Sequence, residues 1–391
     1  MKLVLLTHPS SLHSESMPRF ARYIHDGMLA RGHQVECWTS KIILGKLAVR
    51  SNFIRKWLGY IDQFVIFPRT LRKRVRETPP DHLFVVMDQA LGMWVPNIGN
   101  RPLVIHCMDF LALRSALGEF PENPTGWTGR QYQRLIRNGF SSGRHFLSIS
   151  KNTQTDLHRL SRQPIVSSEV AYIGLNSDFA IMQREEAIAE LAPFLSPSEK
   201  DGFLLHVGGS QWYKNREGVI EIYRAWCKVT SSAIPLWMIG SPPTDSLRKF
   251  ANDIPNGGTV RFLEGLSDAQ VRSAYNLTKL FLFPSLEEGF GWPIVEALAC
   301  GALVLTTGHA PMTEVGGDAV EYLSRRTLSN RSEWAHEGGA KIAMLLSLSD
   351  SEKQSRQALG VEHAKKFASD ATLDRYEEHY QRILRSYGIE T

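Results

Sequence analysis

The segment FLFPSLEEGFGWPIVEALACGALVLTT, residues 281–307, holds the residues with the clearest potential for chemistry. A helix is expected to begin near Pro293, because proline is favoured in the first turn of a helix. Glu288 lies in the loop before this helix and Glu296 lies one turn inside it, so both carboxylates can face one pocket. Free amides at a helix start bind anions, and carboxylates accept hydrogen bonds from sugar hydroxyls. The pattern predicts a site for a diphosphate that links a sugar and a ribose.

Chance gives a competing explanation for the two glutamates. A pair eight positions apart is expected about once in a chain of this length, and the helix dipole alone favours a glutamate near a helix start. The wider pattern is more specific, since a strand, the loop Gly289-Phe290-Gly291, a proline and the second glutamate follow one another. The glycines let the backbone approach a ligand closely.

Two similar halves are expected to position these residues. Apolar runs alternate with amphipathic helical segments along the chain, which is typical of parallel sheets covered by helices. The predicted strands cover residues 3–7, 35–39, 83–87, 103–107 and 145–150 in the first half, and 202–208, 235–240, 259–263, 279–284 and 302–307 in the second. The fold class is therefore α/β, with two Rossmann-like, doubly wound parallel sheets and a cleft where loops from both sheets meet.

The sequence resembles the retaining family 4 glycosyltransferases, or glycosyl transferases group 1, which have the GT-B fold. The resemblance covers nearly the whole chain and is strongest over residues 204–322. The family signature is two glutamates separated by seven residues in an EGFG-x-P-x-x-E frame, which Glu288 and Glu296 match. The resemblance implies that Glu288 contacts the donor sugar and Glu296 holds the ribose. It also implies that the amides of Phe290 and Gly291 meet the diphosphate.

A second matching element is HVGGSQWYKNREG, residues 206–218. The resemblance implies that Gly208 and Gly209 line the donor site and that Lys214 neutralises the diphosphate, a role that suits a compact cation on a firm loop. Gly209 stands where the family often has arginine. Lys214 is alternatively a solvated lysine in a turn.

The first half is expected to bind the acceptor. The segment LVIHCMDFLALRSALGE, residues 103–119, resembles a family strand and loop that end in His-Asp. Asp109 matches the aspartate, but Met108 replaces the histidine. His106 lies two positions earlier, on the same face of the strand. It either takes the place of the missing catalytic histidine or is a buried core residue, and the sequence leaves both interpretations open.

The loop after the first strand, residues 8–20, stands where many family members have a glycine-rich loop. His13, Ser14 and Arg19 within it are predicted to contact the acceptor.

Positive charge is concentrated in one segment. The net charge is +5, but residues 41–76 hold ten Lys or Arg and one acid, a net charge of +9, so the remainder sums to −4. Aromatic and aliphatic side chains recur at helical spacing within residues 51–77, and such a segment favours an anionic membrane surface. The predicted membrane contacts are Arg55, Lys56, Trp57, Arg72, Lys73 and Arg74. The alternative is a helix pair packed on its own domain with a solvated basic face.

Composition and missing motifs argue against other classes. The 391 residues, 43% of them hydrophobic and 22% charged, are ordinary for a globular protein of two or three domains. Four scattered cysteines without a CxxC pair indicate reduced thiols in the cytosol. No DxD motif and no metal-ligand spacing occurs, which argues against a metal-dependent GT-A enzyme. No GxGxxG follows a first strand, which argues against a dehydrogenase.

These features predict a metal-independent glycosyltransferase, without a cofactor, that moves a sugar from a nucleotide-diphosphate donor to a hydroxyl with retention of configuration. Residues 1–175 are expected to bind the acceptor and residues 176–370 the donor, and the resemblance implies that a helix in residues 371–391 crosses back to the first domain.

The expected partners are a nucleotide sugar, a glycan or lipid-linked acceptor and an anionic membrane surface, but no nucleic acid. The expected location is the cytoplasm, at the inner face of the cell membrane, and the expected pathway is surface polysaccharide or lipopolysaccharide assembly. Two alternatives stay open: a non-catalytic nucleotide-sugar-binding partner of an active enzyme, and a sugar-nucleotide epimerase on the same fold.

Overall fold

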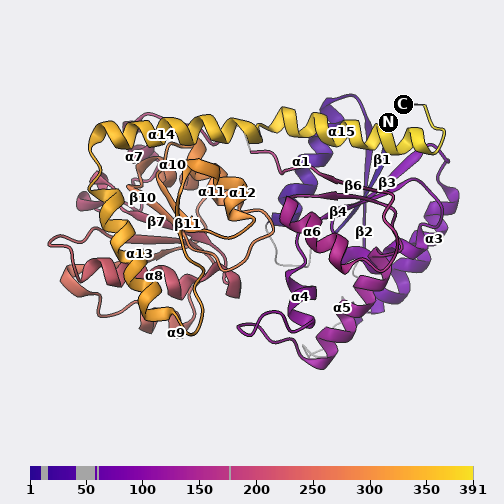
Figure 1. Cartoon of the computed structure of the whole chain (residues 1–391). Coiled ribbons are helices and arrows are strands. Elements are labelled where there is room, and N and C mark those ends of the chain that lie inside the picture. The colour runs from indigo at the N-terminus through magenta and orange to yellow at the C-terminus, as the bar shows by residue number, and fades with distance from the viewer. Residues whose placement is uncertain (10–15, 41–57, 60, 176–177, 391) are drawn as a thin grey trace. The chain divides into compact units, whose positions relative to one another are not determined.

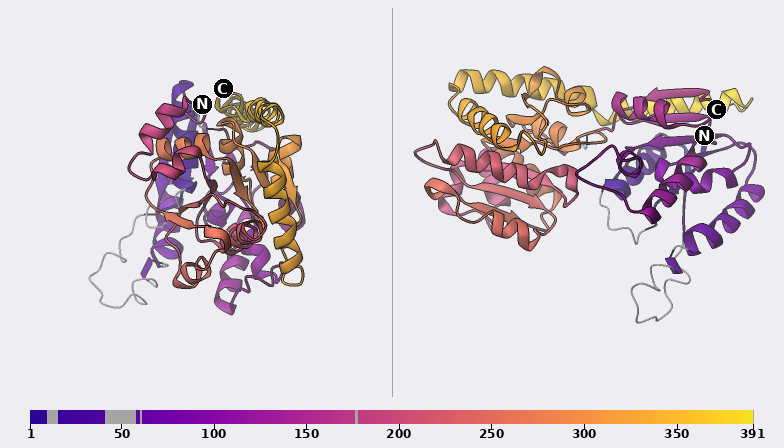
Figure 2. Two further views of the ribbon diagram at one scale, coloured as in Figure 1. Left: turned by 90° about the vertical axis from the view of Figure 1, so that its left-hand side faces the viewer. Right: turned by 60° about the horizontal axis from the view of Figure 1, so that its bottom comes forward.

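The computed structural model of the protein describes residues 1–9, 16–40, 58–59, 61–175 and 178–390. The chain divides into two compact units. Unit 1 comprises Met1–Ile173 and Asp370–Thr391, and unit 2 comprises Gly174–Ser369. Each unit contains a six-stranded sheet with helices on both faces (Figures 1 and 2). All described strand pairs are parallel, so the predicted α/β fold class with two doubly wound sheets is confirmed.

Unit 1 has the strand order β2-β1-β3-β4-β5-β6. Its strands are β1 (Lys2–Thr7), β2 (Gln34–Thr39), β3 (His82–Val86), β4 (Leu103–Cys107), β5 (His145–Ser148) and β6 (Ser167–Val170). Its helices are α1 (Ser16–Ala30), the π-helical turn η2 (Asp62–Ile66), α3 (Phe67–Glu77), the 3-10 helix η3 (Gln89–Asn97), α4 (Leu111–Ala116), α5 (Trp127–Phe140), α6 (Lys151–Leu160) and α15 (Ser369–Ser386).

Unit 2 has the strand order β12-β11-β10-β7-β8-β9. Its strands are β7 (Leu204–Gly208), β8 (Leu236–Gly240), β9 (Val260–Leu263), β10 (Leu280–Phe283), β11 (Val304–Thr307) and β12 (Glu321–Leu323). Its α-helices are α7 (Arg184–Glu190), α8 (Arg216–Cys227), α9 (Asp245–Phe250), α10 (Asp268–Leu277), α11 (Trp292–Ala299), α12 (Met312–Gly316), α13 (Arg331–Leu346) and α14 (Asp350–Ala364). Its 3-10 turns are η4 (Pro197–Asp201), η5 (Trp212–Lys214), η6 (Pro255–Gly257), η7 (Gly317–Ala319) and η8 (Lys365–Phe367).

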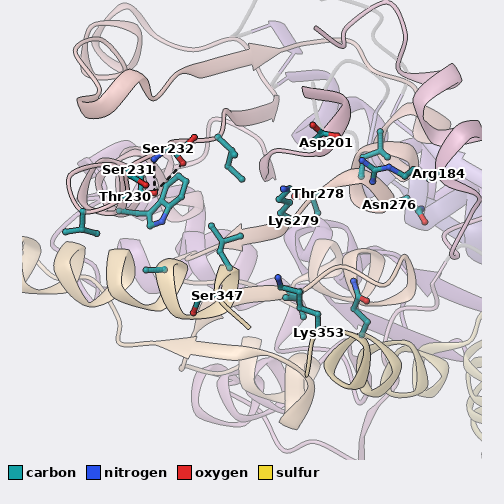
Figure 3. A pocket seen from close by; sticks show the side chains of 18 residues that line it. Arg184, Asp201, Thr230, Ser231, Ser232, Asn276, Thr278, Lys279, Ser347 and Lys353 are labelled. Carbon is teal, nitrogen blue, oxygen red and sulfur yellow. Dashed lines mark hydrogen bonds between the residues drawn. The ribbon is translucent and has the colours of Figure 1, made fainter. Parts of the chain in front are cut away.

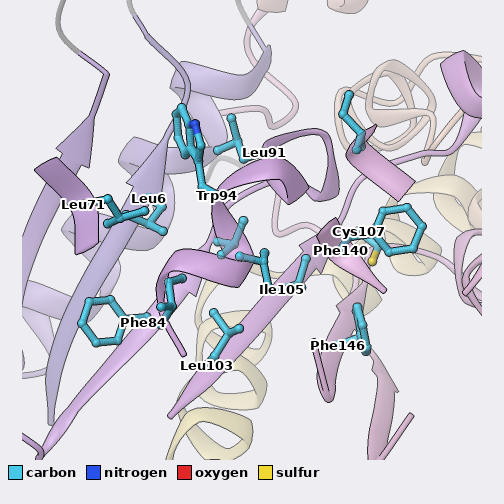
Figure 4. Close-up of a cluster of buried hydrophobic side chains, with 14 of the residues drawn as sticks. Leu6, Leu71, Phe84, Leu91, Trp94, Leu103, Ile105, Cys107, Phe140 and Phe146 are labelled. Atoms are coloured by element: carbon cyan, nitrogen blue, oxygen red, sulfur yellow. The ribbon is translucent and has the colours of Figure 1, made fainter. Parts of the chain in front are cut away.

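One face of the unit 1 sheet carries a continuous apolar core (Figure 4). Alternate residues of the central strands pack there against α3, η3, α5 and α6, with Trp94 and Phe140 fully buried at the centre. The central strands are buried on both faces, which explains why they are continuous apolar runs instead of alternating ones.

The opposite face of the unit 1 sheet is covered by α1 and α15. On α1, Phe20, Ile24 and Met28 recur every four residues and are fully buried, as expected for the inner stripe of a helix. Arg31, just after α1, pairs with Asp374 of α15 at 2.7 Å. The last helix of the chain is therefore part of the core of unit 1 (Figure 1).

The core of unit 2 follows the same plan. One face of its sheet packs against α8 and α13, where Tyr223 and Trp334 are buried. On the other face Tyr275 of α10 meets Phe281 of β10, with ring centroids 5.2 Å apart. Ser267 caps α10 through the amide of Gln270.

Among the described residues, no helix combines the length and the apolar character that crossing a bilayer requires.

Candidate active site

In each unit the strand order reverses direction at one point, and ligands of doubly wound sheets bind beside the carboxyl ends of the strands at that point. In unit 2 the reversal lies between β7 and β10. Lys214 lies in the turn after β7, and Glu288 lies in the loop after β10. The structure thus brings together two of the predicted site residues that are 74 positions apart in the sequence.

Lys214 and Glu288 form a largely buried ion pair. The Nζ of Lys214 donates to Oε1 of Glu288 at 2.7 Å, and the two side chains are 14% and 7% exposed. The ammonium group also lies 5.0 Å from the ring centroid of Phe283, within range of a cation–π contact. Either charge would be costly to bury alone. The pair therefore allows both charged groups to lie at a largely buried site.

Glu296 lies on α11, eight positions after Glu288, and is buried. The hydroxyl of Tyr275 donates to its Oε2 at 3.3 Å. The helix begins after Gly291, whose φ of +99° is a left-handed conformation that favours glycine. Gly291 has no side chain with which to cap α11, so no side chain occupies the start of this helix, a position that favours anions. Phe290 is anchored against Phe367, with ring centroids 5.7 Å apart.

Gly208 ends β7 and Gly209 follows it, and only at Gly208 does a buried ring stand in the way of a side chain. A Cβ atom on Gly208 would lie 2.8 Å from Nε2 of His206, and one on Gly209 would lie 2.3 Å from Oε1 of Gln211. The ring of His206 is fully buried, and its Nδ1 donates to the carbonyl of Leu282 at 2.9 Å. Burial lowers the pKa of His206 to about 3, so the imidazole near Lys214 is neutral.

Arg216 is directed toward the end of β8, which pairs with the end of β7. Its guanidinium is mostly buried and donates to the carbonyl of Ser241 at 2.9 Å. Burial lowers the pKa of Arg216.

In unit 1 the strand order reverses between β1 and β3. His8, directly after β1, has its Nε2 atom 2.8 Å from Oδ2 of Asp88, two residues after β3. The sequence interpretation missed this pair, although each residue closely follows a predicted strand. The position of both residues at the carboxyl ends of predicted strands was the signal that could have identified the pair.

Asp109 lies at the same edge of the unit 1 sheet, after β4. Its Oδ1 accepts from the amide of Leu111 at 3.0 Å, which caps α4. Gln89 connects the two neighbouring strand ends, since its Oε1 accepts from the amide of Met108 at 2.7 Å and its Nε2 donates to the carbonyl of Asp109.

His106 lies in the core of unit 1, which fits the second of the two interpretations that the sequence leaves open. Its ring is fully buried and stacks on Tyr376 of α15 with ring centroids 5.2 Å apart. Its Nε2 atom lies 2.7 Å from the hydroxyl of Tyr380. Burial lowers the pKa of His106 to about 3. The alternation of strand side chains points it into the face covered by α1 and α15, and not beyond the end of the strand.

Of the predicted acceptor contacts, Arg19 lies in the first turns of α1 and is partly exposed. His13 and Ser14 lie outside the described residues.

The basic segment corresponds in part to α3. Phe67, Leu71 and Val75 are its buried face. Arg72 and Lys73 are exposed, whereas Arg74 is half-buried with its guanidinium 3.8 Å from the ring centroid of Trp38. Arg74 is therefore turned away from the exposed basic face. Arg55, Lys56 and Trp57 lie outside the described residues.

A polar cavity of about 720 Å³ lies at the opposite edge of the unit 2 sheet (Figure 3). Ile234, Thr278 and Leu303 line it, just before β8, β10 and β11. It therefore opens at the amino ends of the strands, where doubly wound sheets do not bind their substrates, and we do not place the donor there.

Comparison with known proteins is consistent with this geometry. Residues 188–358 match the family model described as glycosyl transferases group 1. The O-antigen chain mannosyltransferase B of Escherichia coli is 25% identical over 192 residues, which cover 49% of this chain and 50% of that protein. The chain thus spans about half the length of the curated relatives it matches, or less.

Two solved structures are similar over nearly the whole chain. Sucrose-phosphate synthase from Thermosynechococcus elongatus has a TM-score of 0.75 at 15% identity and covers 99% of this chain and 100% of its own. Anabaena Alr3699/HepE, solved in complex with UDP and glucose, has a TM-score of 0.67 at 16% identity, with 97% and 98% covered.

The fold of the two units is therefore GT-B, as the resemblance in the sequence implies. The matched segment lies within unit 2 and contains Lys214, Glu288 and Glu296. This segment of unit 2 is thus similar to the glycosyl transferases group 1 family.

Proposed function

We propose that this protein is a glycosyltransferase that moves a sugar from a nucleotide-diphosphate donor to a hydroxyl acceptor. The observation that carries the proposal is the largely buried bond between Lys214 and Glu288, in a segment that matches the glycosyl transferases group 1 model and also holds Glu296 and the start of α11. A cation and a helix start without a side-chain cap suit a diphosphate, and the two carboxylates suit the sugar and ribose hydroxyls on either side of it.

The ion pair gives each residue a role in donor binding. When the diphosphate binds, Lys214 exchanges its bond to Glu288 for a phosphate oxygen, and Glu288 is released to accept hydrogen bonds from the donor sugar. Glu296 accepts from the ribose, and the amides of Phe290 and Gly291 donate to the diphosphate. Charge that develops on the leaving diphosphate is stabilised by Lys214 and these amides, without a metal ion.

We propose transfer with retention of configuration by front-face attack. The acceptor oxygen forms a bond to the anomeric carbon on the face from which the diphosphate leaves. The bond between that carbon and the phosphate oxygen breaks, and the hydroxyl proton passes to the leaving phosphate. This step requires no nucleophile from the protein. We propose that unit 1 binds the acceptor.

The pathway we propose is surface polysaccharide assembly at the cytoplasmic face of the membrane. The name of the Escherichia coli relative, an O-antigen chain mannosyltransferase, supports a mannose donor as the first to test. The complex of HepE with UDP and glucose supports UDP-glucose as the second.

An anionic membrane surface is the partner that we propose for α3. Arg69, Arg72, Lys73 and Arg76 recur at helical spacing on the exposed side of the helix, opposite its buried apolar face. Ile61 and Val65, just before α3, are 39% and 41% exposed. Basic residues beside exposed apolar side chains bind anionic lipid, at about 1 kcal/mol for each Lys or Arg near the surface.

Vesicle co-sedimentation tests the membrane contact. Changing the four basic residues of the α3 stripe to Glu should abolish binding to phosphatidylserine vesicles. The control variant changes Arg248, Lys249, Lys365 and Lys366 of unit 2 to Glu. It alters the net charge by the same amount and should reduce vesicle binding less than the α3 variant does. Equal losses in the two variants would refute a specific role for α3.

Calorimetry with a panel of nucleotide sugars tests the enzymatic proposal. The wild-type protein should bind one donor and release its nucleoside diphosphate slowly in the absence of acceptor. Glu296→Ala should weaken binding about 10- to 100-fold, the loss expected for hydrogen bonds to a charged group. The exposed Glu333→Ala variant is the control. Binding without turnover would support a non-catalytic partner, and interconversion of the donor sugar would support an epimerase.

A further inference from the structure

The pair formed by His8 and Asp88 has the features of a binding site in unit 1. The two side chains are 15% and 10% exposed, so they are mostly but not completely withdrawn from solvent. The carboxylate of Asp88 makes two contacts. Its Oδ1 accepts from the amide of Ala90 at 2.8 Å, and its Oδ2 lies 2.8 Å from Nε2 of His8. The first contact caps η3, and the second holds the imidazole in one orientation.

The orientation of the ring leaves one nitrogen for a ligand. Because a carboxylate can only accept, Nε2 of His8 carries the proton and donates it to Asp88. In a neutral imidazole Nδ1 is then an acceptor. Within the described part of the chain, no group hydrogen-bonds this atom.

The position of the pair also indicates a ligand. It lies where the strand order of unit 1 reverses, at the carboxyl ends of β1 and β3. Gln89 joins this point to Asp109 after β4, so polar groups from three adjacent strands gather at one edge. The buried His106 belongs to the core by contrast, since its ring is covered by tyrosines.

The chemistry of this edge favours a neutral ligand over a phosphate. Asp88 and Asp109 occupy amides at the starts of η3 and α4, and both add negative charge. An anion at this edge would meet these carboxylates, whereas no side chain caps the start of α11 in unit 2. Hydroxyl groups can both donate to Nδ1 of His8 and accept from nearby donors.

We infer that His8, oriented by Asp88, binds a hydroxyl of the carbohydrate acceptor at the strand-order reversal of unit 1. This inference rests on the proposed function and adds the acceptor side of the site. His8 contacts the acceptor directly, and Asp88 is a positioning residue that fixes the tautomer and the direction of the ring.

Nuclear magnetic resonance of the imidazole nitrogens, with histidine labelled by nitrogen-15 in the full chain, tests the contact. Methyl α-D-mannopyranoside, methyl α-D-glucopyranoside and methyl α-D-galactopyranoside serve as probes. At least one of them should shift the Nδ1 signal of His8 and leave the signals of His25 unchanged. His25 forms an exposed pair with Asp26 at 2.7 Å and is therefore a matched control. If no probe moves the His8 signal up to its solubility limit, the inference is overturned.

Variants separate acceptor binding from folding and from donor binding. His8→Phe and Asp88→Asn should weaken binding of the responding glycoside about tenfold, the loss of one good hydrogen bond. Asp88→Asn keeps an oxygen to cap η3, so it should fold even if His8→Phe does not. Donor affinity by calorimetry should be unchanged in both variants, as in His25→Phe. Unchanged glycoside binding in folded variants would refute the inference, whereas a wild-type protein that binds no nucleotide sugar would refute the proposed function instead.

Discussion

The two units solve the same geometric problem with different polar groups. Each has six parallel strands whose order reverses once, and each places an ionisable pair across the reversal. Unit 1 has His8 and Asp88 at 2.8 Å, and unit 2 has Lys214 and Glu288 at 2.7 Å. In unit 1 aspartate side chains accept from amides at the neighbouring helix starts, whereas in unit 2 α11 follows a glycine and has no side-chain cap. We infer from this difference that the polar groups beside the strand ends, more than the sheet itself, decide whether a unit favours an anionic or a neutral ligand.

The buried histidines give a second comparison. His106 in unit 1 and His206 in unit 2 are both fully buried in central strands, and burial lowers the pKa of each to about 3. Neither is exposed enough to meet a substrate directly. His8 differs because it follows its strand and stays partly accessible.

Removal of the cation in unit 2 should have the largest effect. Lys214→Ala is expected to reduce the transfer rate about 10²- to 10³-fold, the range found when one preorganised electrostatic group is lost from an active site. The measurement is the turnover number with saturating donor. Lys341→Ala removes the cation of a comparable pair, Lys341 with Glu321 at 2.7 Å, and should leave turnover unchanged. Equal effects in the two variants would mean that Lys214 is only a structural partner of Glu288.

Acid should destabilise both units through their buried histidines. At pH above 6.5 each is neutral in the folded and the unfolded chain. Between pH 6.5 and about 3 only the unfolded chain binds the extra proton, so the free energy of unfolding falls as the pH falls. The expected loss is about 1.4 kcal/mol per pH unit for each histidine, or about 2 kcal/mol each at pH 5.

Urea unfolding at pH 7 and pH 5 measures this loss. His106→Gln should flatten the pH dependence of the unit 1 transition, and His206→Gln that of unit 2. His25→Gln, at an exposed position, should leave both slopes as they are. A histidine variant of the core that keeps the full pH slope would show that its ring titrates normally in the folded protein.

The smallest effects should come from single tyrosine hydroxyls. Tyr380→Phe removes the partner of His106 and should lower the free energy of unfolding of unit 1 by about 1 kcal/mol without changing donor affinity. Tyr275→Phe removes the hydroxyl that holds Glu296 and should weaken donor binding, by about fivefold for a loss of about 1 kcal/mol. Thermal unfolding and calorimetry separate the two. An effect of Tyr380→Phe on donor affinity would contradict the assignment of His106 to the core.

Much of the fold could be predicted because buried parallel strands are continuous apolar runs. Ten strands were predictable in this way, but β6 and β12 were not, since Ser167–Val170 and Glu321–Leu323 carry polar residues and are partly exposed. The pairing of α15 with α1 depends on contacts more than 340 positions apart, and periodicity alone does not reveal its partner.

The site was predictable where residues are close in the chain. Glu288, Glu296 and the glycine loop form one local pattern, whereas the bond from Lys214 to Glu288 spans 74 positions and needs the strand order of the sheet. The same is true of His8 and Asp88, 80 positions apart. The role of His106 was ambiguous, because the alternation of side chains along a strand shows on which face a residue lies but not what covers that face. Here α15 covers it.

The most direct test of the account is a crystal structure of the protein with the nucleoside diphosphate of its preferred donor. The account predicts the diphosphate at the amides of Phe290 and Gly291, with Lys214 bound to a phosphate oxygen and Glu296 to the ribose. A nucleotide bound instead in the cavity at the amino ends of the unit 2 strands, with the bond from Lys214 to Glu288 intact, would contradict it.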